Sequence, residues 1–306
     1  MDSPASIPPL SRASEKLIDA AVAIADDPAR VRWAFLARQL VQCTLPHKNP
    51  GKVPVWVRRS GNAALVIRPA WTGQGTFVGY PYGSIPRLLL YWVVTEAKRT
   101  GKRRLELGRN LADFMREIGL NPDTGGGKRG DAKRLREQMR RLFRCSISFE
   151  ISAATDASRG EAWMGMDVTS AGELWWDVKN PEQGHLWESW IELGEKFFES
   201  IMAAPVPFDM RVLRAMKGSA LALDLYAMVS YRTFTAREAV FIPWRTLMQQ
   251  FGAEYKRPQD FSRKVRGVVR KINTLQPELM VAALDDCLKI APSPTLIPPR
   301  VNLQVG

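Results

Sequence analysis

The sequence holds few of the residues from which catalytic and metal sites are commonly built. Its two histidines, His47 and His185, lie far apart, and neither has a second histidine nearby. Its three cysteines are dispersed and odd in number, so they indicate neither a disulfide framework nor a zinc-ligand spacing. We therefore expect both histidines to be ordinary surface residues. We predict no catalytic residues, no metal site and no cofactor.

Long apolar runs are also lacking. The most apolar short stretch, residues 88–94, is far too short to span a bilayer. The N-terminal MDSPASIPPL has neither the cationic nor the apolar region of a secretion signal, so we expect a cytoplasmic protein. The glycine-rich TGGGKRG at 124–130 is not a Walker phosphate loop, because Pro122 and Arg129 stand where glycine and serine or threonine are required.

Negative charge is scarce relative to positive charge. The chain has 44 lysines and arginines against 31 aspartates and glutamates, which gives a net charge of +13. Such an excess favours a polyanionic partner, either a nucleic acid or an anionic membrane surface, over a generally basic protein with no such partner. The chain has 306 residues, which is enough for two domains.

The pattern of apolar residues predicts a mixture of helices and strands. Apolar residues between Leu17 and Leu40 follow a helical rhythm interrupted at Pro28, which predicts two helices over 14–42. A first set of elements then follows: strands within 53–80, a helix at 84–101, a strand at 104–108, a helix at 110–120, a basic helix at 128–144, and strands at 145–151, 162–168 and 173–178.

A second set of elements repeats this order. It comprises a strand at 205–209, helices at 210–217 and 219–234, a strand at 239–244, a helix at 245–252, a basic helix at 258–274, and strands at 279–284 and 287–292. The shared plan of helix, strand, helix, helix and hairpin is typical of a winged helix. We predict an α+β fold of two tandem winged-helix domains with an N-terminal helical extension. The predicted parts are a tail and helix at 1–30, a first domain at 31–180, an acidic linker helix at 181–204 and a second domain at 205–306.

The two basic helices carry the residues that we predict to contact DNA. On a helical wheel their apolar residues gather on one side and their cations on the other, with few carboxylates to balance them. A solvated cationic face is the alternative interpretation. The second helix contributes Lys256, Arg257, Gln259, Arg263, Lys264, Arg266, Arg270 and Lys271, and the first contributes Lys128, Arg129, Lys133, Arg136, Arg140 and Arg144.

These candidates divide into two roles. Arginine can donate two hydrogen bonds to guanine in the major groove, so Arg263, Arg266 and Arg270 are the candidates for base reading. Lys256, Arg257, Lys264 and Lys271 are expected to hold phosphates, and the first basic helix is expected to enter an adjacent groove. Four tryptophans could stack on unpaired bases, but we favour a core or a dimer contact for them. They are Trp175, Trp176, Trp187 and Trp190.

Several segments resemble the plasmid-encoded RepA-type replication initiators of broad-host-range plasmids. They are YPYGSIPRLLLYWVVTEAKRTG, LELGRNLADFMREIGL, RLREQMRRLFRCSISF and PVPFDMRVLRAMKGSALALDLYAMVSYR. The resemblance implies binding to repeated sites (iterons) in double-stranded plasmid origin DNA, opening of adjacent A·T-rich DNA, and contact with the host replicative helicase and the host initiator. It also implies a monomer–dimer equilibrium, association with the nucleoid or plasmid, and no enzymatic activity.

Two other functions remain open at this point. A transcriptional repressor with the same fold would contact DNA in the same way but take no part in initiation. A nuclease or primase would need clustered histidines and carboxylates, which the sequence does not offer. The apolar strands around VPVWV and ALVIR, together with the tryptophans, are the candidates for self-association.

Overall fold

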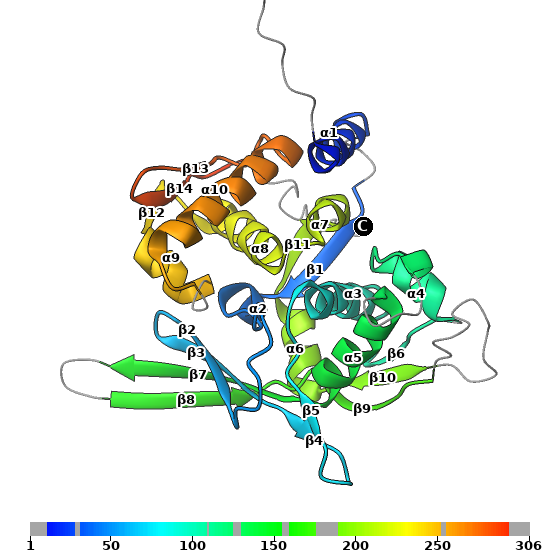
Figure 1. The fold of residues 1–306 in the computed structure, drawn as a ribbon. Coiled ribbons are helices and arrows are strands. Elements are labelled where there is room, and N and C mark those ends of the chain that lie inside the picture. The colour runs from blue at the N-terminus through cyan, green and yellow to red at the C-terminus, as the bar shows by residue number, and fades with distance from the viewer. Residues whose placement is uncertain are drawn as a thin grey trace, which may run out of the picture.

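A computed structural model provides the structure of the chain, which is a mixed α+β protein (Figure 1). None of the helices in the described segments is long and apolar enough to cross a membrane. The structure describes residues 11–27, 31–108, 110–124, 130–154, 159–175, 189–251 and 255–293.

Two groups of elements share one order and one pattern of strand pairing, and we call them the first and second modules. The three-stranded sheet of the first module has the order β6-β10-β9, and that of the second has the order β12-β14-β13. In both, the strand that follows the first helix pairs with the last strand of the module. The first module comprises α3 (Ser84–Thr100), β6 (Arg104–Glu106), α4 (Leu111–Glu117), α5 (Asp131–Arg144), β9 (Thr169–Glu173) and β10 (Trp190–Leu193). The second comprises α8 (Ala220–Thr235), β12 (Val240–Pro243), α9 (Trp244–Phe251), α10 (Pro258–Leu275), β13 (Val281–Ala283) and β14 (Cys287–Ile290).

Local sequence explains where several of these helices begin and end. The Asn110 side chain accepts a hydrogen bond from the backbone N–H of Asp113 at 2.8 Å, which caps α4. Gly119 follows that helix with a φ of 82°, a conformation that favours glycine. Ser219 caps α8 in the same way, and Pro258 occupies the first turn of α10, where its missing N–H costs nothing.

The strands that follow α5 correct one prediction. The segments at 145–151 and 162–168 were expected to form the hairpin of the first module, and they do pair, as β7 (Ser146–Ala154) and β8 (Arg159–Gly165). They do not join β6, however. They extend β2 (Trp56–Ser60) and β3 (Ala63–Arg68) into a separate sheet of order β2-β3-β7-β8, because the buried residues of β7 lie opposite those of β3.

The N-terminal region corrects a second prediction. A helix forms as α1 (Arg12–Ala25), but the second expected helix is replaced by β1 (Trp33–Ala37) and a short α2 (Arg38–Gln42). β1 pairs antiparallel with β11 (Pro205–Asp209), so a partner distant in sequence overrides the helical spacing. α1 packs against α10 and α7 (Met210–Met216).

The predicted linker helix at 181–204 is also only partly a helix. Among its described residues, Trp190–Leu193 form strand β10 and only α6 (Glu195–Ala203) is helical. β10 pairs with both β6 and β9, so this acidic segment completes the sheet of the first module rather than connecting two separate units. Residues 181–188 lie outside the described residues.

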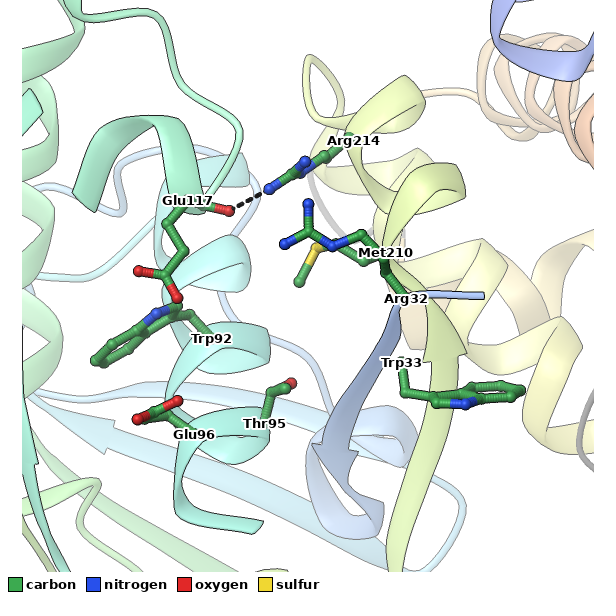
Figure 2. Close-up of a pocket in the computed structure, with 8 residues that line it drawn as sticks. All are labelled: Arg32, Trp33, Trp92, Thr95, Glu96, Glu117, Met210 and Arg214. Carbon is green, nitrogen blue, oxygen red and sulfur yellow. Dashed lines mark hydrogen bonds between the residues drawn. The ribbon is translucent and has the colours of Figure 1, made fainter. Parts of the chain in front are cut away.

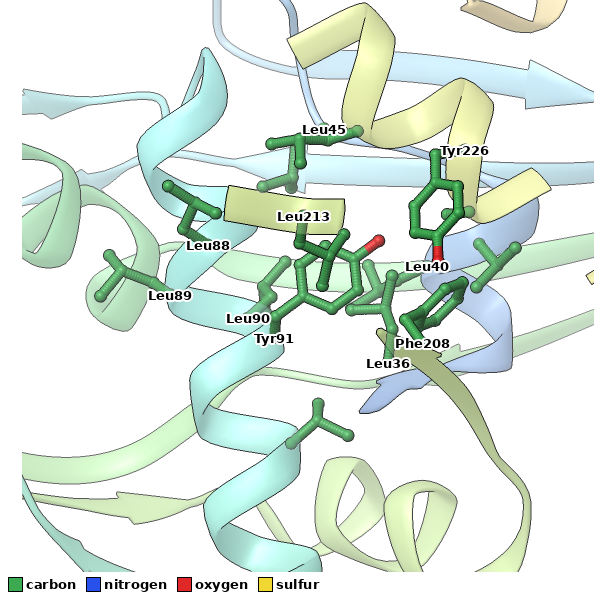
Figure 3. Close-up of a cluster of buried hydrophobic side chains, with 14 of the residues drawn as sticks. Leu36, Leu40, Leu45, Leu88, Leu89, Leu90, Tyr91, Phe208, Leu213 and Tyr226 are labelled. Carbon is green, nitrogen blue, oxygen red and sulfur yellow. The ribbon is translucent and has the colours of Figure 1, made fainter. Parts of the chain in front are cut away.

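One apolar core joins the two modules. It takes side chains from α3, α8, β1, β11 and α7, and Figure 3 shows these residues interleaved. Tyr91 of α3, Phe208 of β11 and Tyr226 of α8 form a chain of ring contacts with centroid distances of 5.3 and 5.9 Å. β1 and β11 lie between the two modules (Figure 1). The modules are therefore packed on each other and not merely tethered.

Candidate nucleic-acid interface

Helix α10 separates its apolar residues from its cations as the helical wheel predicts. Phe261, Val265 and Ile272 are fully buried against the rest of the second module. The opposite side is exposed. It carries Gln259, Arg263 and Arg270, with Lys264 and Lys271 on one flank and Lys256 and Arg257 just before the helix, and all seven are exposed.

Arg263 and Arg266 of α10 are engaged in different ways. The Arg263 guanidinium donates to the Asp260 carboxylate at 2.6 Å, but its side chain stays 77% exposed. Arg266 turns towards the β13–β14 hairpin. Its Nη1 donates to the carbonyl oxygen of Ala283 at 3.1 Å and its Nη2 donates to those of Leu284 and Asp285 at 2.7 and 3.2 Å. Arg266 therefore connects α10 to the hairpin, and Arg263 and Arg270 are the more accessible arginines.

The tip of this hairpin is acidic. Asp285 and Asp286 lie in the turn between β13 and β14, and both are exposed. The Asp285 carboxylate is 3.7 Å from the Arg266 guanidinium. Two carboxylates at this position oppose a close approach to phosphates, so the cations of α10 are a better match for a polyanion than the hairpin tip is.

Helix α5 has the same construction in the first module. Leu135, Met139 and Leu142 are fully buried, and Arg136, Arg140 and Arg144 are exposed on the opposite side. Lys133 lies on the same side and is half-buried. Lys128 and Arg129, which were predicted to precede the helix, lie outside the described residues.

Few carboxylates compensate these cations. Within the described residues, the ion pairs on the two helices are Arg134–Asp131 at 3.1 Å, Arg141–Glu137 at 4.0 Å and the two pairs of α10 given above. In that part of the chain no ion pair involves Arg136, Arg140, Arg144 or Arg270. The outward sides of α5 and α10 therefore keep an excess of positive charge with which a polyanion can interact.

The described tryptophans of the cluster do not fill the core. Trp175 is 43% exposed, and Trp190 is half-buried, with the Arg104 guanidinium 3.9 Å from its ring centroid and its Nε1 donating to the Glu173 carboxylate. Trp176 and Trp187 lie outside the described residues. Of the two roles favoured for the cluster, the core position is thus wrong for Trp175 and Trp190, and the dimer contact stays a prediction. Trp190 lies at the start of β10, and Trp175 lies two residues after β9.

A buried ionic network at the joint of the modules was missed. Arg87 of α3 donates to both carboxylate oxygens of Asp224 of α8, at 2.6 and 2.7 Å, and to three backbone carbonyls. His47 lies 2.8 Å from the same carboxylate, so the prediction that it is a surface residue is wrong. The sequence carries a signal for it, because Arg87 and Asp224 each interrupt an apolar run within a helix.

Burial and charge shift the proton affinities in this network. Burial lowers the pKa of His47, although the hydrogen bond to Asp224 opposes that effect. Burial alone would raise the pKa of Asp224, but the Arg87 guanidinium and His47 together hold it well below its usual range. The stable form near neutral pH is therefore a charged Arg87–Asp224 pair beside a neutral histidine.

A contact with α7, outside the two modules, closes the end of helix α4. Arg214 of α7 donates through Nη2 to the carbonyl oxygen of Glu117 at 2.7 Å (Figure 2). Lys217, just after α7, donates to the carbonyl oxygen of Gly119. Burial and the nearby Arg32 lower the pKa of Arg214. These cations satisfy the last carbonyls of α4, where positive charge is favoured. Helix α4 of the first module is thus anchored to α7, which packs against α8 of the second module.

Comparison with known proteins assigns the family. The family model for plasmid-encoded RepA protein matches residues 80–245, which is more than half of the chain. The chain belongs to this RepA family. It is therefore a plasmid replication protein, as the resemblance in the sequence implied. The match covers the whole first module and the second as far as the start of α9, while α10 lies beyond it. No curated protein and no solved structure matches the chain.

Proposed function

We propose that this RepA-family protein is a replication initiator that binds repeated sites at its plasmid origin. The observation that carries the proposal is that α5 and α10 occupy equivalent places in two modules and both expose uncompensated cations. The element order and the sheet orders support an assignment of each module as a winged helix, in which α4–α5 and α9–α10 are the helix-turn-helix pairs. Such pairs place their second helix in the major groove.

The role proposed for each side chain follows from how exposed it is. Arg263 and Arg270 of α10 read base edges, because their guanidinium groups are exposed and can form paired hydrogen bonds with guanine. Lys256, Arg257, Lys264 and Lys271 hold phosphates, and so do Lys133, Arg136, Arg140 and Arg144 of α5. Arg266 holds the hairpin against α10 and assists these contacts indirectly.

Origin binding serves initiation when the bound protein deforms DNA and brings in host proteins. Opening of A·T-rich DNA, contact with the host helicase and host initiator, and a monomer–dimer equilibrium belong to this proposal as well. Self-association would use the sheet β2-β3-β7-β8, whose exposed apolar residues include Val57, Ile151 and the 78% exposed Trp163. These roles need no catalytic residues.

A footprinting and complementation experiment tests the proposal. Purified protein should protect a set of direct repeats in plasmid DNA that carries the gene's own flanking region. A plasmid with that origin and a deleted gene should replicate only when the gene is supplied in trans. Protection without a replication requirement would instead identify a repressor, and metal-dependent nicking or primer synthesis would identify an enzyme. Absence of any specific protection would refute DNA-site recognition.

A further inference from the structure

A cleft separates helix α5 from a small hairpin that the sequence analysis did not assign to any function. The hairpin consists of β4 (Ala70–Trp71) and β5 (Phe77–Gly79), and it lies beside α5 in Figure 1. The cleft between them has a volume of about 200 Å³. It is lined by Thr72, Thr76, Phe77, Val78, Glu137, Arg140 and Arg141.

Close packing fixes the hairpin against the helix. Gly79 has a φ of 91°, and a Cβ at this position would lie 3.3 Å from Nε of Arg141, so a larger residue would meet both strain and crowding. The Arg141 guanidinium also lies 5.2 Å from the ring centroid of Tyr82. Gln138 of α5 accepts a hydrogen bond from the backbone N–H of Tyr82 at 2.9 Å. The hairpin therefore keeps a defined position at the edge of the basic helix.

The cleft offers more hydrogen-bond donors than it uses. Nη1 of Arg141 is buried and has no hydrogen-bond partner in the described part of the chain. Thr72 accepts a hydrogen bond from the backbone N–H of Thr76 at 3.1 Å, which leaves its own hydroxyl hydrogen able to donate. Arg140 contributes a second, exposed guanidinium. Glu137 is the one carboxylate among the lining residues, and it lies 4.0 Å from Arg141.

Two guanidinium groups and two hydroxyls around one opening suit a phosphodiester group. Arginine binds phosphate through paired, charge-assisted hydrogen bonds, and threonine hydroxyls commonly donate to phosphate oxygens. Arg140 belongs both to the cleft and to the outward side of α5. A duplex that places its groove over α5 would therefore bring one strand's backbone to the cleft.

We propose that the cleft between α5 and the β4–β5 hairpin is a phosphate-binding site for the backbone of the DNA that α5 contacts. The inference rests on the proposed function, because it assumes that α5 lies on DNA. The hairpin is then a third DNA-contacting element beside the two basic helices. It fixes the position of the first module along the backbone and carries no base specificity of its own.

Charge changes at Thr76 in both directions test the site. Thr76 is exposed on the hairpin and lines the cleft. Thr76→Glu should lose about one phosphate contact, which lowers the salt slope of origin binding by about one unit and weakens binding roughly eightfold at 0.1 M salt. Thr76→Lys should tighten binding by a similar factor and raise the slope, a gain that misfolding cannot produce. Fluorescence anisotropy over a salt series measures both.

Thr235 provides the matched control, since it is an exposed threonine at the end of α8 in the second module. Thr235→Glu and Thr235→Lys change the net charge equally and should leave the salt slope unaltered. Ethylation interference should further show one phosphate whose modification weakens the wild type but not Thr76→Glu. Thr76 variants that match the wild type or the Thr235 variants would overturn the cleft proposal alone. A wild-type protein that binds no DNA would overturn the proposed function itself.

Discussion

Replacement of Asp224 by asparagine should strongly destabilise the fold. The carboxylate and the Arg87 guanidinium are 7% and 4% exposed, so solvent screens their interaction little. Asparagine keeps the size of the side chain but leaves the Arg87 charge buried without a counter-charge. Breaking a buried pair in this way costs about 3–5 kcal/mol of the free energy of unfolding. With a slope of about 3 kcal/mol per molar urea for a chain of this size, the unfolding midpoint should fall by about 1–1.7 M.

The control and the pH dependence make this prediction specific. Glu199→Gln removes a pair at the surface, with Lys196, and should cost far less, because both side chains are exposed and solvent screens their charges. The folded-state pKa of Asp224 is lowered, so its stabilisation is complete above an unfolded pKa of about 3.9 and is lost as the pH falls below that value. The difference between wild type and Asp224→Asn should therefore shrink below about pH 4.

A double variant completes the test. Arg87→Met with Asp224→Leu removes both charges together and should destabilise less than the sum of the single changes, because neither charge is then left alone. Urea unfolding of the wild type, Arg87→Met, Asp224→Leu and the double variant at pH 7 gives the coupling free energy between the two side chains. The reasoning fails if Asp224→Asn costs no more than Glu199→Gln, or if the two single effects simply add.

Four further changes have defined outcomes. Arg266→Ala should weaken binding to all duplex sequences without changing the preferred base. Arg270→Ala should instead lower discrimination at one base position by about 1–3 kcal/mol. A changed base preference for Arg266→Ala in a binding-site selection would contradict the indirect role of Arg266. Lys256→Ala should lower the salt slope by about one unit, which a salt titration measures, while Lys16→Ala on α1 should not. Gly119→Ala should destabilise the fold by about 1–2 kcal/mol because of the positive φ of Gly119, and by more because the new Cβ would lie 3.1 Å from the Arg214 side chain. Gly61→Ala is the control, since Gly61 also has a positive φ but faces open space. A smaller loss of thermal stability for Gly119→Ala than for Gly61→Ala would contradict the contact.

Local signals in the sequence were sufficient for most helices and for the repeated order of elements. The apolar spacing of 84–101, the cap at Asn110 and the proline that begins α10 depend on neighbours in sequence, and the structure places those helices where they were predicted. The segregation of cations on α5 and α10 follows from helical geometry alone. These features could be predicted because each is decided within a few turns of chain.

Long-range pairing explains what could not be predicted. Residues 33–37 have a helical spacing but meet β11 more than 160 residues later, and β7 finds β3 rather than β6. The roles of His47 and Arg266 likewise depend on contacts with distant segments. Periodicity reports which face of an element is apolar, but it does not report which distant element that face will meet.

The core that joins the two modules has a consequence for the arrangement of sites on DNA. A flexible linker would let the two modules adjust to half-sites at various separations, but the interleaved side chains of the shared core resist movement of one module relative to the other. Each added base pair shifts a half-site by about 3.4 Å and rotates it by about 34° around the duplex. The protein should therefore bind well only when two half-sites have one particular spacing, so that the number of base pairs between them matters as much as their sequence.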